Sequence, residues 1–82
     1  MNRVIRVAPR SDHQVDVTFA DGLSALIKLR PFLDKGIAAE LLAPEKFALV
    51  MVEEGGGISW PNGFDVCPEF LRELATKRQA AA

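Results

Sequence analysis

Residues 15–29 read VDVTFADGLSALIKL, and this stretch decides the fold. In each half of the stretch every second residue is apolar, which is the pattern of a strand that is buried on one face. The dipeptide Asp21-Gly22 between the halves tolerates positive φ and marks a tight hairpin turn. We therefore predict two antiparallel strands, near 14–19 and 23–29.

Further elements are expected on both sides of this hairpin. The β-favouring residues before Pro9 predict a strand near 3–8. Pro31 can open a helical turn and Pro44 can stop one. We therefore expect a short helical region near 31–43.

The second half of the chain predicts more strands and a final helix. The run FALVMV, which starts at Phe47, is apolar on both faces and predicts a central strand near 47–53 that is covered on two sides. A shorter strand is expected near 57–60. Pro68 suits the first turn of a helix, and the apolar stripe that follows it predicts a C-terminal helix near 68–78. These elements predict an α+β fold, a small antiparallel sheet with helices packed on it.

Composition limits the class of protein. The chain has 82 residues, of which 49% are hydrophobic and 26% charged, and its formal net charge is -1. These values predict one globular domain over residues 1–82. One Cys and one His exclude an internal disulfide and a zinc site built mainly from Cys and His. The single cysteine suits a reducing compartment, and the longest apolar run is far too short to span a bilayer, so we expect a cytoplasmic protein.

The residue types that carry chemistry show no catalytic pattern. The glycines at 55–57 lack the context of a phosphate-binding loop and predict a hairpin turn. His13 lies in a polar connection, and we expect an ordinary surface histidine. Cys67 precedes the last helix, whose N-terminus could activate a thiol, but we favour a half-buried small hydrophobe at the helix start. Because the carboxylates are also dispersed, we expect no catalytic residue, no metal ion and no cofactor.

Two short motifs are more specific. The first is Phe19-Ala20-Asp21-Gly22, and the second is Trp60-Pro61-Asn62-Gly63-Phe64-Asp65. Together with the apolar run at Phe47, they resemble the bacterial domain of unknown function 2442, over roughly residues 3–74. One departure is Val66, where that family commonly has Leu.

The resemblance implies a small α+β domain without established enzymatic activity. Members of such families stand alone, lie beside a partner gene that resembles a toxin component, or are fused to a helix-turn-helix domain. The Trp60 ring should be buried, and Asn62-Gly63 permits the tight turn that follows it. The motif residues that we interpret as structural are Phe19, Asp21, Gly22, Trp60, Pro61, Asn62, Gly63 and Asp65.

These observations favour a non-enzymatic module that binds a partner protein or forms a homo-oligomer such as a homodimer, with an antitoxin-like or regulatory role as the family-level expectation. The alternative is a DNA-binding transcriptional regulator that acts as an oligomer and uses the basic N-terminal strand, which holds Arg3, Arg6 and Arg10. The charge balance gives no basic field, so we do not expect nucleic acid to be bound directly. An enzyme that uses Cys67 or His13 ranks last.

Overall fold

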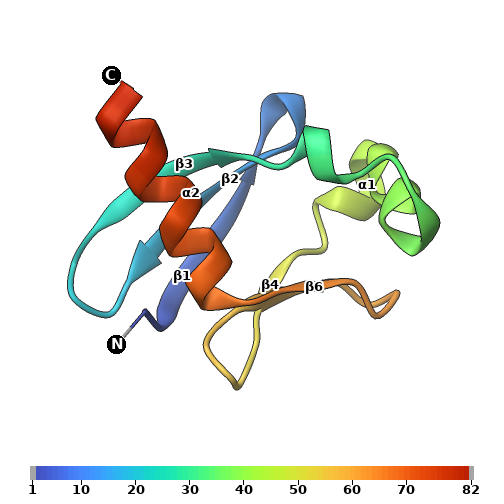
Figure 1. Ribbon diagram of the computed structural model, residues 1–82. Helices are drawn as coiled ribbons and strands as arrows, with labels where there is room; N and C mark the ends of the chain where they lie inside the picture. The colour runs from blue at the N-terminus through green and yellow to red at the C-terminus, as the bar shows by residue number, and fades with distance from the viewer. Residues whose placement is uncertain (1, 82) are drawn as a thin grey trace.

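Two three-stranded antiparallel sheets and a C-terminal helix form the structure, a computed structural model that describes residues 2–81, with side chains described for residues 2–77 (Figure 1). In chain order the elements are β1 (Val4–Arg10), η1 (Ser11–His13), β2 (Gln14–Phe19), β3 (Ser24–Lys28), η2 (Arg30–Phe32), η3 (Gly36–Leu42), α1 (Pro44–Phe47), β4 (Met51–Val52), β5 (Ile58–Ser59), β6 (Asp65–Val66) and α2 (Pro68–Ala81). The strand orders are β1-β2-β3 and β4-β5-β6, and α2 lies across one face of the first sheet (Figure 1). The α+β class is confirmed. No helix in the described part of the chain is long and apolar enough to cross a membrane.

The first sheet is built around β2. It pairs with β1 on one side and β3 on the other, and its side chains alternate between fully and partly buried. At the turn Gly22 has φ 96°, a conformation that favours glycine. The N–H of Phe19 donates to the carbonyl of Leu23 at 2.8 Å. The hairpin predicted over 14–19 and 23–29 is confirmed.

The strand β1 carries a bulge near its start. Val4 pairs with Phe19, but Arg6, two residues later, pairs with Thr18, the direct neighbour of Phe19. Ile5 is therefore the extra residue of a β-bulge.

The strand predicted near 3–8 continues past Pro9 to Arg10. A proline removes one backbone donor, and we expected it to end the strand. Because β1 is an edge strand of its sheet, the missing donor is tolerated there.

The second sheet differs most from the prediction. The run at 47–52 is not a central strand, because Phe47 ends α1 and only Met51–Val52 forms a strand, at the edge of its sheet. The physical cause is Pro44, which fits the first turn of a helix and begins α1 directly after η3 has ended at Leu42. Both β4 side chains are exposed, so the expectation of a strand covered on two sides is wrong. The strands also form two sheets instead of the single one predicted.

The remaining predictions hold with small shifts in their bounds. The helical region near 31–43 consists of two 3₁₀ segments, η2 and η3. The strand predicted near 57–60 contains β5. The C-terminal helix begins at the predicted Pro68 and extends to Ala81, beyond the predicted end near 78.

One apolar core joins the two sheets, η3 and α2. Fifteen apolar side chains are buried there, and no polar side chain is buried within the described residues. Trp60 is the largest of them and is 2% exposed, and its indole N–H donates to the carbonyl of Phe47 at 2.9 Å. Leu71 and Ala75 bring α2 into the same core. Each large side chain contributes about 1.5–3 kcal/mol through burial.

The glycines at 55–57 form the hairpin turn between β4 and β5, as predicted. Glu53 N–H donates to the carbonyl of Gly57 at 2.8 Å, which closes the turn. The carbonyl of Gly56 accepts a 2.8 Å hydrogen bond from Val4 N–H, so the turn also fixes the start of β1. A Cβ at Gly57 would collide with the backbone carbonyl of Val66 on β6.

This crowding predicts that Gly57→Ala lowers the free energy of unfolding by about 1–3 kcal/mol, the usual cost of forcing an extra methyl group into a packed site. Gly55→Ala is the matched control, because nothing lies within 4 Å of a Cβ at that position. Urea denaturation followed by tryptophan fluorescence measures both variants. Equal midpoints for the two variants would show that the turn relaxes freely at Gly57.

Candidate functional site

The second motif forms a turn that is fixed to a distant segment. Trp60 N–H donates to the carbonyl of Phe64 at 2.9 Å, and Gly63, with φ 98°, donates to the carbonyl of Trp60 at 3.0 Å. The Asn62 side chain accepts from Phe64 N–H at 3.0 Å and donates to the carbonyl of Ile37 at 3.0 Å. The amide of Asn62 thus closes the turn and ties it to η3.

The first motif fastens the β2–β3 hairpin to α2. The carboxylate of Asp21 accepts hydrogen bonds from two guanidinium nitrogens of Arg72, at 2.8 and 3.1 Å. The same guanidinium lies over the ring of Phe19, 4.9 Å from its centroid. The hydrogen bond from Arg72, together with one from Leu23 N–H, lowers the pKa of Asp21 from 3.8 to about 2. A bidentate arginine pair of this kind sets geometry as well as energy.

The structure keeps the two motifs apart. Figure 1 shows the β2–β3 turn and the turn before β6 at opposite ends of the molecule. Asp65, which we interpreted as a structural residue of the motif, is exposed, and its carboxylate makes no hydrogen bond to the described residues. Pro61 is also exposed. The motif residues therefore do not converge on a shared site.

His13 lies in a different environment from the one predicted. Its Nε2 is 2.8 Å from the carbonyl of Leu42, so this nitrogen carries the proton and donates. The ring packs edge-on against Phe47, with centroids 5.2 Å apart. Both His13 and Asp12 have positive φ, 58° and 61°, and this backbone conformation turns the imidazole inward. His13 is half-buried, so the expectation of an ordinary surface histidine holds only in part.

The inward position of His13 also limits its chemistry. Its Nδ1 is buried and has no hydrogen-bond partner among the described residues. A general base must reach the proton that it abstracts, directly or through one water. With Nε2 bound to a carbonyl and Nδ1 buried, the ring packs between η1 and α1.

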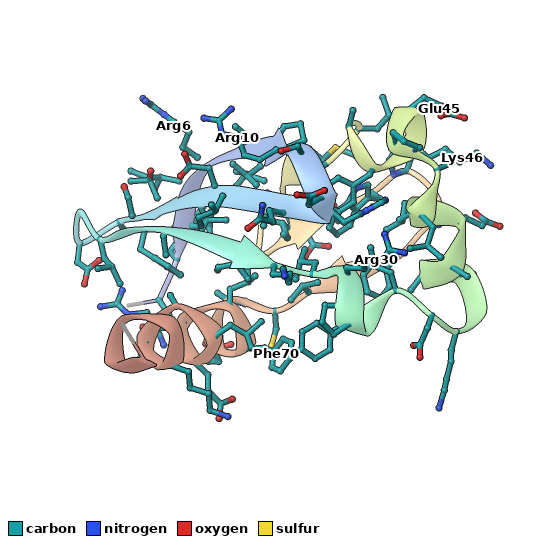
Figure 2. All side chains as sticks on the ribbon, turned by 90° about the horizontal axis from the view of Figure 1, so that it is seen from above. Arg6, Arg10, Arg30, Glu45, Lys46 and Phe70 are labelled. Carbon is teal, nitrogen blue, oxygen red and sulfur yellow. The ribbon has the colours of Figure 1, made fainter. Side chains whose placement is uncertain are left out.

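Cys67 is exposed, and not half-buried as we expected. It lies on the rim of a depression of about 190 Å³. Phe32 and Phe70 also line this depression, with ring centroids 5.2 Å apart, and Figure 2 shows Phe70 at the start of α2. The thiol makes no hydrogen bond to the described residues. Within the same residues, no group of three or more His, Cys, Asp or Glu side chains is placed to hold a metal ion.

Exposed apolar side chains on and beside β4 were not expected from the sequence; Met51 and Val52 are consecutive residues of this strand, so their side chains point to its opposite faces. Ile5, Leu49, Met51 and Val52 are 56%, 54%, 47% and 37% exposed. β4 packs beside β1, which carries Ile5. We call these four residues the β4 surface. The expectation of a covered strand at 47–53 concealed it, because that expectation placed the same apolar residues in the core.

The Asp21–Arg72 pair predicts a specific dependence of stability on pH. The pKa of Asp21 is lower in the folded protein than the usual 3.8. The contribution of its ionised carboxylate to the free energy of unfolding is therefore fully present above about pH 4. It is lost as the pH falls through about 2. We expect Asp21→Asn to lower the urea midpoint at pH 7, with a difference from the unmodified protein that shrinks between pH 4 and pH 2.

Asp34→Asn is the control for that experiment, because Asp34 is exposed and forms no ion pair with the described residues. Its urea midpoint should follow that of the unmodified protein across the same pH range. Identical behaviour of both variants would contradict a stabilising role for the pair.

Exposure of Cys67 predicts that iodoacetamide modifies it in the native protein. Because the thiol is accessible and lacks hydrogen bonds, the rate should lie within about threefold of the rate in the urea-unfolded chain. Mass spectrometry over a time course gives both rates. A much faster native reaction would indicate an activated thiol, and no native reaction would show that the thiol is covered.

Comparison with known proteins agrees with the motifs described above. The chain has no significant match among curated proteins or among solved structures. The model of one family, described as a protein of unknown function (DUF2442), matches residues 4–77. This match includes both motifs, the β4 surface and most of α2, and the chain belongs to the DUF2442 family.

Proposed function

We propose that the protein is a non-enzymatic interaction module that binds a partner protein, or a second copy of itself, through the β4 surface. The observation that carries this proposal is the exposure of four large apolar side chains on and beside an edge strand. Large exposed apolar side chains are candidates for burial in an interface when they form a contiguous patch. The cytoplasmic setting indicated by the single cysteine is part of the proposal.

The position of β4 supports association through main-chain contacts as well. An edge strand has backbone groups on its outer side that no neighbouring strand of its own sheet uses. Natural edge strands are protected by charges, prolines or a covering segment. Neither Met51 nor Val52 is charged, and β1 packs beside β4. A strand or loop from a partner would cover the side chains and the backbone together.

The placement of the two chemistry-bearing residues supports a role without catalysis. The imidazole of His13 donates to a backbone carbonyl and packs on Phe47. The thiol of Cys67 has no base or second thiol bonded to it among the described residues. In the antitoxin-like form of the proposal, the partner is the product of a neighbouring gene.

Replacing Met51 with glutamate tests the β4 surface. We expect Met51→Glu to weaken association by at least about tenfold, because it places a charge at the centre of an apolar contact. Light scattering over a range of concentrations measures self-association. Co-purification from native expression, followed by mass spectrometry, identifies a partner.

Ile37→Glu is the matched control, because Ile37 is 49% exposed but lies on η3, outside the β4 surface. It should associate as the unmodified protein does, and circular dichroism should show both variants folded. A protein that is monomeric at every concentration and that co-purifies with nothing would overturn the proposal.

A further inference from the structure

The outer face of the first sheet is a second surface, distinct from the β4 surface. The pairing of β1, β2 and β3 places nine side chains on the face opposite the core, in three rows across the strands. The rows are Arg6, Thr18 and Ser24; Ala8, Asp16 and Leu26; and Arg10, Gln14 and Lys28. The residues between them, such as Val17 and Ile27, point into the core. Figure 2 shows Arg6 and Arg10 projecting from β1 on the side away from α2.

The outer face carries a net positive charge, whereas the chain as a whole carries a net negative one. The face holds three cations and one carboxylate, whereas the whole chain has a formal net charge of -1. Arg10 forms an ion pair with Asp16 at 3.2 Å. Arg6 and Lys28 are exposed, and neither forms an ion pair with the described residues. Two cations at opposite corners of the outer face therefore remain available to an external anion.

The face is also suited to close contact. Thr18 and Ser24 are short, and their hydroxyl groups lie 3.1 Å apart. Ala8 and Leu26, on either side of Asp16, give the middle row an apolar part. The two available cations are separated by four residues along the strands and by two strand spacings, which is roughly 13 Å by 10 Å. A segment of a folded protein can span this distance between the two cations.

We propose that the outer face of the β1-β2-β3 sheet binds an acidic segment of a partner protein, whose carboxylates pair with Arg6 and Lys28. Complementary charge favours such a partner and disfavours basic ones. The proposal rests on the function proposed above only in taking the ligand to be a protein, because the outer face and the β4 surface share no residue.

Nucleic acid fits this face less well. A phosphate backbone crossing it would pass over the carboxylate of Asp16 in the central row. With few cations, the face could neutralise only a few phosphates, and affinity for nucleic acid depends on their number. A protein segment can place an apolar side chain or a hydrogen-bond donor at the centre and carboxylates at the corners.

Titration of the isotope-labelled protein with a short glutamate peptide, observed by NMR amide shifts, tests the proposal. We expect shifts confined to β1, β2 and β3 at low salt, which disappear as salt is added. A matched glutamine peptide should cause none. The double variant Arg6→Gln and Lys28→Gln should weaken binding of the glutamate peptide about tenfold.

The control is the double variant Lys35→Gln and Lys77→Gln, which changes the net charge equally but alters exposed cations outside the outer face. It should bind the glutamate peptide within about twofold of the unmodified protein. Equal loss in both variants, shifts outside the first sheet, or no shifts would overturn the proposal. Tighter binding of a short DNA duplex than of the glutamate peptide would also overturn it and would favour the DNA-binding alternative.

The two proposals fail in distinguishable ways. Met51→Glu changes the β4 surface and should leave the peptide titration unaltered. Loss of association in that variant with normal peptide binding supports both surfaces. If the protein self-associates or captures a partner but does not bind the glutamate peptide, only the proposal of an acidic segment on the outer face is contradicted.

Discussion

The burial of the Trp60 indole is the constraint on which most of the second half of the structure depends. An indole N–H placed in an apolar core needs an acceptor, and the carbonyl of Phe47 supplies one at 2.9 Å. The indole ring also packs between Phe47 and Phe64, with each centroid 5.6 Å away. The end of α1, the turn after β5 and the start of β6 are thereby held around one side chain. The amide of Asn62 adds a second tie, to η3.

The first sheet could be predicted from the sequence because the residues that determine it lie close together along the chain. The alternation along β2 and the Asp21-Gly22 turn act within a few residues of each other, so the register needs no distant contact. The start of α2 was predicted for the same reason, from Pro68. The burial of Trp60 followed from its alternation with Ile58 in sequence.

The failures share a different cause. An apolar run does not state whether it is covered on two sides, on one side or only at its end, and the run from Phe47 is divided among a helix, a turn and an edge strand. The orientation of His13 depends on two consecutive residues with positive φ, which ordinary propensities do not indicate. The partner of Asp21 lies 51 positions away at Arg72, and no local pattern contains that pairing. Exposure of the β4 surface could be recognised only after these segments had been placed.

The bulge at Ile5 determines what the first strand can be used for. Strict alternation from the buried Val4 would turn Arg6 and Arg10 toward the core, and the one extra residue reverses the direction of every side chain after it. Loss of Ile5 alone would give regular pairing and leave both arginines on the outer face. Loss or gain of a residue between Arg6 and Arg10 would instead turn one arginine toward the core or slip the strand. Variation among related chains should therefore be richer in substitutions than in insertions or deletions between Arg6 and Arg10.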